Sequence, residues 1–431
     1  MSTAPRSGPL HPASAPGDQL SLRRANLSRT LGHLRAHGPR SRAAIAAGTG
    51  LHKATVSSLV DELLARQLVQ ETGLEYSGTA GRPGRAVALD GAGVGALGVA
   101  INVDYIGVHA TDLAGRVLVE RRIAFDATAG GPDRCVAALT EVILEALRDL
   151  ERRGAVPVGV TVAVPGLVDV AHGAVVLAPN LDWHDLPLGP RLVAALPAGL
   201  RVVVDNDANL AALAEHTYGV AAGTRDLVYL TGEVGVGGGV ISDGRLLRGT
   251  DGFSGEVGHL PVDPAGRRCG CGRTGCWETK VGLAELVRAV TPDRAYGLES
   301  GPLRVPEERV AELHRRLAAG DPVALDAVAE VGRWLGLGGA ILVNLVNPRV
   351  LVLGGYFATL AEWLIPAARP ELDRLAVAGR AAHCRFVASD LGFTAAARGA
   401  AGVVVDRVIA DPTSVGSPPD TVTRVTAVRV P

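Results

Sequence analysis

Hydrophobic residues near the start of the chain recur at the spacing of a helix. Three leucines that would share one face predict a first helix over residues 22–37: Leu27, Leu31 and Leu34. A short second helix is expected over residues 42–47, and a third over residues 53–66 after a glycine-bearing turn. Two helices joined by such a turn are typical of a helix-turn-helix.

The third predicted helix has an apolar stripe and carries short polar side chains at its N-terminal end. In a helix-turn-helix that end enters the major groove of DNA, where such side chains and a lysine reach base edges and phosphates. Residues 68–71 and 86–89 predict the two strands of a wing. The wing contributes two arginines to the predicted DNA contacts. The predicted DNA contacts are Arg42, Lys53, Thr55, Ser57, Ser58, Arg82 and Arg85.

The rest of the chain alternates buried strands with helices, which predicts an α/β fold. Continuous apolar runs predict strands over residues 95–103, 156–164, 200–204, 228–231 and 350–353. These runs end in polar or glycine-rich loops, and such loops are where α/β folds place their ligands. Two similar strand–turn–strand units, near residues 97–118 and 227–247, indicate an internal duplication with a cleft between two lobes.

Charge separates the N-terminal segment from the remainder. Residues 21–85 carry ten Lys and Arg against four Asp and Glu, a net charge of +6, whereas residues 86–431 carry a net charge of −7. A basic head on an acidic body favours a polyanionic partner for the head. The alternative is a three-helix protein-interaction module whose surface charge is a chance bias.

Composition is that of a globular protein with an aliphatic core. The 431 residues are 47% hydrophobic but only 3% aromatic. We expect a disordered tail over residues 1–20, a winged helix-turn-helix over 21–90, a sensor domain over 91–412 and a C-terminal tail over 413–431. No apolar run approaches the roughly 20 residues that a bilayer needs, so we expect no membrane span and a cytoplasmic location.

Three of the five cysteines lie within eight residues of one another, and a histidine precedes them. Zinc binds thiolate sulfur and imidazole nitrogen in a tetrahedron, and one histidine with three cysteines leaves no position for water. We therefore predict a structural Zn²⁺ held by His259, Cys269, Cys271 and Cys276. The alternatives, disulfides or three unrelated thiols, fit this tight odd-numbered cluster less well.

Two further motifs carry polar groups suited to a ligand. Asn206-Asp207 follows a predicted strand, where the amide and carboxylate can bind sugar hydroxyls and the carboxylate can act as a general base. Capping of the next helix would explain the same two residues. Glu256 and His259 lie among glycines upstream of Glu278, which indicates either a ligand-binding loop or a solvated one. The run Gly235–Gly239 could cradle a phosphate with backbone amides.

Taken together, the motifs resemble those of the ROK family, which contains repressors, open reading frames of unknown function and sugar kinases. The resemblance covers residues 22–411 and is carried by three segments: His259-x9-Cys269-x-Cys271-x4-Cys276-x-Glu278, Asn206-Asp207-Ala208-Asn209 and Pro179-Asn180-Leu181. It implies a winged helix-turn-helix followed by a two-lobed actin-like, sugar-kinase-like (ribonuclease H-like) domain whose zinc loop spans residues 255–278. It also implies a sugar site lined by Asn180, Asn206, Asp207, Glu256, His259 and Glu278, with Asp207 in the position of a kinase's base.

The departures from the family's kinases concern the nucleotide. Those kinases begin the domain with Asp-x-Gly-Gly-Thr, where this chain has Ala100-Ile101-Asn102-Val103-Asp104. Their second phosphate loop contains Gly-Thr-Gly, where this chain has Glu233-Val234-Gly235. Because phosphoryl transfer depends on the positioning of phosphates and metal, we expect neither ATP nor Mg²⁺ to bind and no catalytic residue to act.

The hypothesis is a sugar-responsive regulator that binds operator DNA as a homodimer or homotetramer. Repression of carbohydrate metabolism genes follows from family analogy alone. One alternative is an ATP-dependent sugar kinase of the ROK family that carries a regulatory DNA-binding head. Another is a regulator that responds to a protein partner and not to a sugar.

Overall fold

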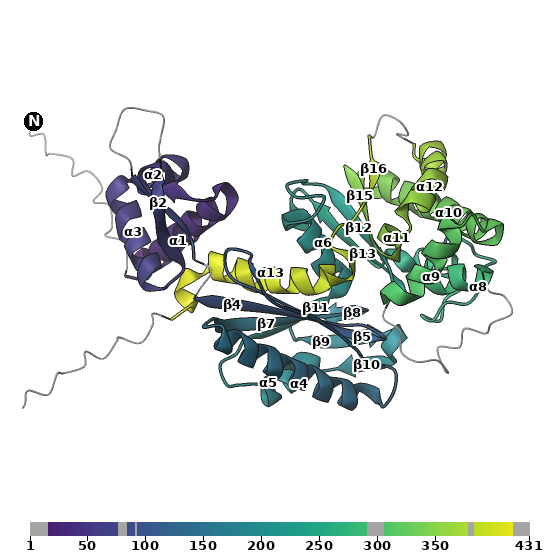
Figure 1. Cartoon of the computed structure of the whole chain (residues 1–431), viewed down its shortest axis with the longest axis horizontal. Helices are drawn as coiled ribbons and strands as arrows, with labels where there is room; N and C mark the ends of the chain where they lie inside the picture. The colour runs from purple at the N-terminus through teal and green to yellow at the C-terminus, as the bar shows by residue number, and fades with distance from the viewer. Residues whose placement is uncertain (1–15, 76–83, 91–92, 291–305, 378–382, 417–431) are drawn as a thin grey trace, which may run out of the picture. The chain divides into compact units, whose positions relative to one another are not determined.

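The computed structural model describes residues 16–75, 84–90, 93–290, 306–377 and 383–416 (Figure 1). The chain forms two compact units. The first, here called the head, contains the chain up to Val94 together with the segment from Asp406 onward. The second, here called the body, is Gly95–Val405.

The head has three helices and a small antiparallel sheet, the arrangement of a winged helix. Its helices are α1 (Pro16–His37), α2 (Arg42–Thr49) and α3 (Lys53–Ala65). Its strands are β1 (Arg40–Ser41), β2 (Val69–Glu75) and β3 (Gly84–Leu89), in the order β1-β3-β2. The three predicted leucines of α1 are buried, and the Ser41 hydroxyl caps α2 by accepting a hydrogen bond from the amide of Ala44.

Helix α1 begins at Pro16, inside the segment expected to be a tail. Proline suits the first turn of a helix, where its missing N–H would have no partner, so the helix can start four residues before the expected boundary. Residues 1–15 lie outside the described part of the chain.

The end of the chain completes the head, whereas the sequence placed residues up to 412 in the body. Arg24 pairs with Asp411 at 3.4 Å, and Arg35 pairs with Asp406. The Arg66 guanidinium donates to the carbonyl of Val415 at 2.7 Å. These contacts join positions more than 340 residues apart, so no local pattern in the sequence could reveal them. The boundary between the units falls inside helix α13 (Ala395–Ala410).

The first lobe of the body contains a five-stranded sheet in the order β11-β7-β4-β5-β6. Its strands are β4 (Val94–Ile101), β5 (Tyr105–Thr111), β6 (Val117–Ala124), β7 (Val156–Val164) and β11 (Val202–Asn206). Helices α4 (Gly131–Arg152) and α5 (Leu188–Ala195) pack on it, beside a small sheet of β8 (Leu167–Asp169), β9 (Ala174–Ala178) and β10 (Trp183–Leu186).

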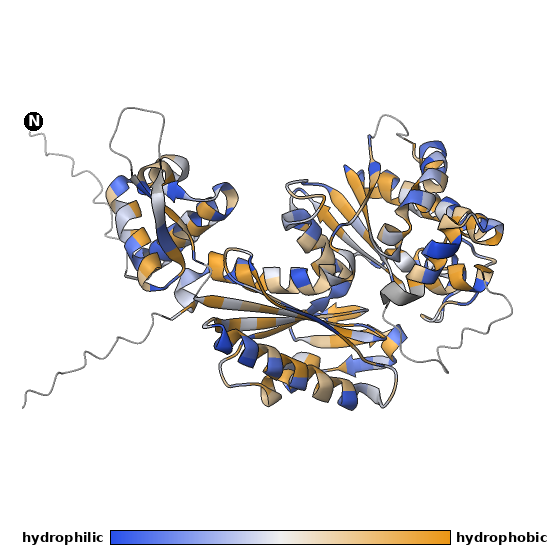
Figure 2. Ribbon diagram, viewed as in Figure 1, coloured by the Kyte–Doolittle hydropathy of each residue, from blue (hydrophilic) through white to orange (hydrophobic). Residues whose placement is uncertain are grey.

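The second lobe contains a sheet in the order β14-β13-β12-β15-β16. Its strands are β12 (Leu227–Gly232), β13 (Val236–Ser242), β14 (Arg245–Leu246), β15 (Val350–Gly355) and β16 (Arg385–Ala388). The hairpins β4–β5 and β12–β13 are both antiparallel, and they correspond to the two strand–turn–strand units expected from an internal duplication. Figure 2 shows the strands of both sheets as predominantly hydrophobic, in agreement with the aliphatic runs in the sequence.

Helices cover the second sheet and join the two lobes. They are α6 (Asp207–Thr217), α7 (Glu278–Val281), α8 (Leu283–Val290), α9 (Pro306–Ala318), α10 (Pro322–Val346), α11 (Tyr356–Thr359) and α12 (Ala361–Leu375). Among the described residues, α10 alone is long and apolar enough to cross a membrane. It packs against α12 and α8 and buries eleven residues, so we interpret it as a core helix.

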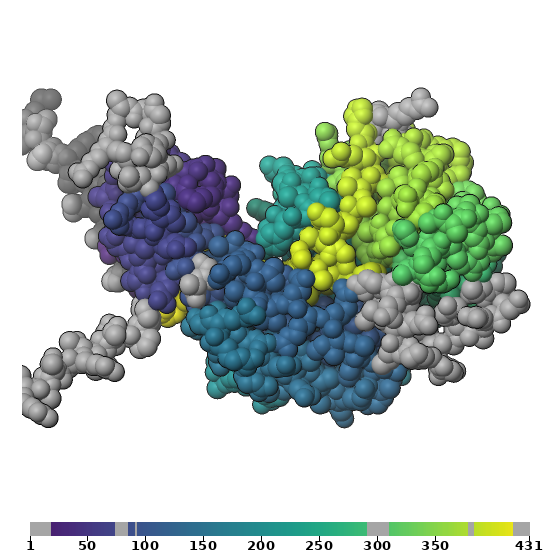
Figure 3. Space-filling model, in the orientation of Figure 1, coloured from purple at the N-terminus to yellow at the C-terminus, as the bar shows by residue number. Residues whose placement is uncertain are grey.

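Helix α13 packs against the interior of the body through small side chains. Ala397 and Ala400 form a buried cluster with Ala100, Ala163 and Leu210, which come from β4, β7 and α6. In Figure 3 the yellow atoms near the end of the chain lie between the blue surface of the first lobe and the teal-to-green surface of the second. This helix therefore contacts both lobes of the body.

A tryptophan beside the cysteine cluster depends on one glycine of α10. Trp277 is fully buried and donates a hydrogen bond to the carbonyl of Trp334 at 2.8 Å. A Cβ at Gly338 would lie 2.1 Å from the Trp277 ring.

We predict that Gly338→Ala lowers the free energy of unfolding by roughly 1–3 kcal/mol, because the buried ring cannot move away from the added methyl group. Urea unfolding followed by tryptophan fluorescence measures the change. Gly32→Ala is the control, since a Cβ at Gly32 in α1 meets nothing within 4 Å and should not destabilise the protein. Equal stability of the Gly338→Ala and parent proteins would contradict the packing argument.

Candidate functional site

The body contains a partly open cavity where the ends of strands from both lobes meet. Its lining brings several polar side chains together in one concave site, as small-molecule sites do. All six predicted sugar-site residues line it: Asn180, Asn206, Asp207, Glu256, His259 and Glu278. The structure therefore brings together residues spread over about 100 positions of the chain, at the strand ends where the sequence predicted a ligand.

Asn206 and Asp207 stand at the junction between β11 and α6. The Asn206 side chain caps α6 by accepting from the amide of Asn209 at 2.9 Å, and its amide group donates to the carbonyl of Gly166 at 3.0 Å. Burial raises the pKa of Asp207 to about 6. Asn206 thus does act as a helix cap, and this capping holds the Asp207 carboxylate at the wall of the cavity.

An ion pair that the sequence did not predict holds the loop before Glu256. The Arg248 guanidinium donates to both carboxylate oxygens of Asp205, at 3.0 and 2.6 Å, and Asp205 is almost fully buried. The carbonyl of Arg248 also accepts from the amide of Ser254 at 3.0 Å. Asp205 directly precedes Asn206-Asp207, but no local signal pairs it with an arginine 43 residues later.

Glu278 connects the cavity to the cysteine cluster. One of its carboxylate oxygens accepts from the amide of Val236 at 3.0 Å, and the other accepts from the Cys269 thiol at 3.3 Å. Gly235 leaves the room for this contact, because a Cβ there would lie 2.6 Å from the Glu278 carboxylate and 2.8 Å from the Asn180 amide nitrogen.

The positions that bind phosphate in the family's kinases contact each other directly here. Glu233, after β12, accepts hydrogen bonds on one carboxylate oxygen from the Asn102 amide and, at 3.0 Å, from the Tyr105 hydroxyl. Asn102 and Tyr105 belong to the first lobe and Glu233 to the second. Burial, and then the negative charge of Asp207, raise the pKa of Glu233 to about 8.

Aromatic side chains occupy the neighbouring strand end. Tyr356 and Phe357 follow β15, whose last residue pairs with the last residue of β12. Both rings are fully buried, with their centroids 4.6 Å apart, and the Tyr356 hydroxyl donates to the carbonyl of Val281. Neither ring lines the cavity.

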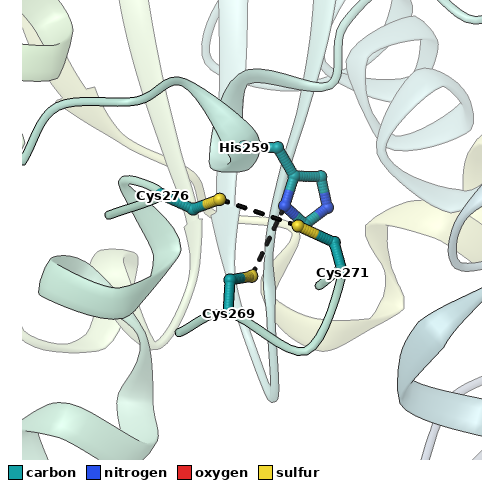
Figure 4. Close-up of side chains that lie close together, drawn as sticks. All are labelled: His259, Cys269, Cys271 and Cys276. Atoms are coloured by element: carbon teal, nitrogen blue, oxygen red, sulfur yellow. Dashed lines mark hydrogen bonds between the residues drawn. The ribbon is translucent and has the colours of Figure 1, made fainter. Parts of the chain in front are cut away.

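The four predicted metal ligands form one cluster (Figure 4). Their ligand atoms all lie within 4.8 Å of one another. The sulfurs of Cys271 and Cys276 are 3.6 Å apart, and the Cys269 sulfur is 3.7 Å from Nδ1 of His259. Two sulfurs bound to one tetrahedral zinc at about 2.3 Å would be about 3.8 Å apart, so the spacing fits this metal and excludes disulfides.

Short backbone contacts shape the loop around this cluster. The amide of Cys269 donates to the carbonyl of Arg273 at 2.7 Å, and the amide of Gly272 donates to the carbonyl of Cys269 at 3.0 Å. The other ring nitrogen of His259, Nε2, is 3.9 Å from the Glu256 carboxylate. His259 therefore faces the cysteines with one nitrogen and the cavity with the other.

In the head, the predicted DNA contacts fall into two groups. Arg42 is held inside the module by Ser57, Asp61 and Glu71, with distances of 2.8 to 3.1 Å, and Arg85 also pairs with Glu71. Lys53 and Ser58 are exposed on α3, whereas Thr55 and Ser57 are partly exposed. Arg82 lies outside the described residues. Two of the predicted cations are exposed to a phosphate: Lys53 at the N-terminal end of α3, and Arg85, whose side chain is 72% exposed.

Family comparisons match both units. The ROK family model matches residues 96–407, and the MarR family model matches residues 26–75. The first match covers the body almost completely, and the second covers the helices of the head and β2.

Known regulators match more of the chain than a known kinase does. The xylose repressor of *Bacillus spizizenii* is 28% identical over 91% of this chain and 98% of its own length. The glucokinase of *Streptomyces coelicolor* is 33% identical over 71% of this chain and 96% of its own length. One solved structure is that of a ROK family transcriptional regulator described as a homolog of the E. coli MLC protein. Its sequence is 28% identical to this chain, and the match covers 91% of this chain and 98% of that one, with a TM-score of 0.75.

The raised pKa of the Glu233 carboxylate makes the stability of the protein depend on pH. Its pKa is about 8 in the folded protein and about 4.5 ordinarily, so the folded state holds the proton more tightly between these values. The contribution of Glu233 to the free energy of unfolding is therefore largest below pH 4.5 and falls as the pH rises to 8.

We predict that Glu233→Gln, which cannot ionise, is more stable than the parent at pH 8.5 by on the order of 2–4 kcal/mol and similar to it at pH 4.5. Urea unfolding across this pH range measures the difference. Glu141→Gln, an exposed position on α4, serves as the control and should follow the parent at every pH. A difference between Glu233→Gln and the parent that does not vary with pH would contradict the assignment.

Proposed function

The chain belongs to the ROK family, and we propose that within it this protein is a sugar-responsive, DNA-binding transcription regulator that represses carbohydrate metabolism genes. The match to regulators over 91% of the chain supports this, since they share the head as well as the body. The effector is a small sugar bound in the cavity of the body, and the partner of the head is operator DNA.

One observation carries the proposal: the cavity keeps all six sugar-site residues while the phosphate positions are closed. Glu233 places a carboxylate at the position where a kinase binds phosphate. Asn102 and Tyr105 donate hydrogen bonds to this carboxylate. Catalysis of phosphoryl transfer is mostly positioning and electrostatic stabilisation of the phosphates. A sugar can therefore bind here without being phosphorylated, and Asp207 serves as a binding group and not as a base.

The kinase alternative needs space for a nucleotide as well. The buried Tyr356 and Phe357 fill the strand end next to β12, beside the position of Glu233. A coupled assay for ADP release over a panel of sugars tests this alternative. Turnover above ~1 s⁻¹, within the usual range for enzymes, would favour the kinase.

Zinc is the metal that the cysteine cluster fits best. Three thiolates and one imidazole are its usual structural ligands, and the four atoms lie at tetrahedral spacing. The ion would stabilise the loop that carries His259 at one end and leads to Glu278 at the other. In this proposal the metal supports the sugar site and takes no part in chemistry.

Regulation requires that sugar binding change the affinity for DNA. Closure of the lobes around a sugar would alter the spacing of two heads in a homodimer or homotetramer and so their fit to paired half-sites. Such a coupling is typically worth 1–3 kcal/mol. The free thiols suit the reducing cytoplasm, where operator DNA is found.

The proposal is tested by selecting DNA sites from a random library with the full-length protein and titrating the selected site by fluorescence anisotropy at about 150 mM salt. We expect one sugar of a panel to change the DNA affinity about tenfold or more. Asp207→Asn should abolish this response while keeping DNA affinity. Lys53→Ala should weaken DNA binding while sugar binding, measured by calorimetry, stays as in the parent.

The two variants control for each other, because each is expected to lose one activity and keep the other. Absence of sequence-specific DNA binding by the parent at moderate salt would refute the regulator. Sequence-specific DNA binding that no sugar changes would favour the regulator that responds to a protein partner.

A second prediction concerns the metal. Purified protein should contain about one zinc per chain, and Cys271→Ser should lose zinc, melt at a lower temperature and bind the sugar more weakly, because His259 and Glu278 contact both the cluster and the cavity. Metal analysis, thermal melting and calorimetry measure the three effects. Cys384→Ala, a buried cysteine outside the cluster, should keep its zinc. Unchanged sugar affinity in a folded, zinc-free protein would refute the coupling.

A further inference from the structure

The residues that line the cavity include four carboxylates and no ordinary cation. The acidic side chains are Asp207, Glu233, Glu256 and Glu278. Among the described residues of the lining there is neither lysine nor arginine, and the single histidine, His259, directs Nδ1 at the cysteine cluster. A negatively charged ligand would therefore meet several acidic groups without a compensating charge.

Four backbone amides near the phosphate positions already have hydrogen-bond partners. In the first loop the amide of Asn102 donates to the carbonyl of Tyr105 at 2.9 Å, and the amide of Val103 donates to the Asn102 side chain at 2.6 Å. In the second loop the amide of Glu233 donates to the carbonyl of Gly235 at 2.9 Å, and that of Val236 donates to Glu278 at 3.0 Å. These four amides are not available to an anion, although free amides are what phosphate-binding loops offer.

Two cations on neighbouring segments, Arg122 and Lys280, do not line the cavity. The Arg122 guanidinium lies 5.2 Å from the centre of the Tyr105 ring and acts to lower the pKa of Glu233. Arg122 does not line the cavity. Lys280 pairs with Asp263 at 2.6 Å and stacks on Trp334. Burial and Asp207 raise the pKa of Glu233 to about 8, so this carboxyl group becomes negatively charged as the pH rises through 8, and repulsion of an anionic ligand grows over the same range.

We propose that Glu233 is a specificity-determining residue that makes the cavity reject phosphorylated and other anionic sugars. The effector is then a sugar that carries neither phosphate nor carboxylate. This inference rests on the sugar-binding function proposed above and narrows its ligand class.

Hydrogen bonding explains why an uncharged sugar is accepted where an anion is not. Sugar hydroxyls donate hydrogen bonds to carboxylate oxygens. A bound sugar can therefore replace the water that Asp207 and Glu256 lose when the ligand covers them. A phosphate ester offers only acceptors on its charged oxygens, and these would face the acceptor oxygens of the carboxylates. Buried charges without a partner are strongly disfavoured, so the penalty falls on the phosphate ester and not on its parent sugar.

Calorimetry on the full-length protein at pH 9, where the Glu233 carboxylate is ionised, tests the proposal with matched pairs of ligands. The pairs are glucose with glucose 6-phosphate, N-acetylglucosamine with its 6-phosphate, and glucose with glucuronic acid; xylose is added as a further uncharged sugar. For the pair whose parent sugar binds, we expect the anionic derivative to bind at least tenfold more weakly. Glu233→Gln should reduce this ratio at least fivefold, mainly by strengthening the binding of the anionic derivative. Glu120→Gln, outside the cavity, should leave the ratio unchanged.

The outcomes separate this inference from the proposed function. A phosphate ester that binds the parent protein as tightly as its parent sugar, or more tightly, overturns the role of Glu233 and leaves the sugar sensor standing. A ratio that stays the same in Glu233→Gln also overturns it. If none of the uncharged sugars and none of the anionic derivatives binds, the sugar sensor itself is wrong and this inference falls with it.

Discussion

The hydrogen bonds from Asn102 and Tyr105 to Glu233 are the interaction on which the character of the cavity depends. They join the two lobes directly at the place where a kinase would hold phosphates between them. A carboxylate buried among other carboxylates costs free energy, and the raised pKa of Glu233 expresses that cost. The fold tolerates this cost because Asn102 and Tyr105 of the first lobe donate hydrogen bonds to the carboxylate. In the proposed function, the same arrangement both excludes a nucleotide and restricts which ligands the cavity can hold.

The remaining parts of the site are organised around this point. The bidentate Arg248–Asp205 pair holds the start of the loop that carries Glu256, and the cysteine cluster holds its continuation. Glu278 links the cluster to the turn after Glu233 through the amide of Val236. A disturbance at the metal ligands is thus transmitted to the cavity through two short contacts, one at His259 and one at Glu278.

Much of the fold followed from local patterns. The helices of the head and the strands β7, β12 and β15 lie within a few residues of their predicted bounds, because apolar periodicity and the turn residues act over short distances. The chain ends were harder to predict. Residues 406–415 join the head through Arg24, Arg35 and Arg66, and ion pairs across more than 340 residues leave no periodic trace in the sequence.

By itself the sequence determined the residue types: the candidate metal-ligand set, the six side chains of the proposed sugar site and the departures from the nucleotide motifs of the family's kinases. Such information lies in the identity and spacing of neighbouring residues. Only the tertiary structure decided how these side chains are satisfied. It showed that Asn206 is a cap as well as a lining residue, that Arg42 is tied to Asp61 and Glu71, and that Glu233 faces Asn102 across the lobes. Pairing between distant segments depends on the packing of the whole domain, and no local pattern encodes it.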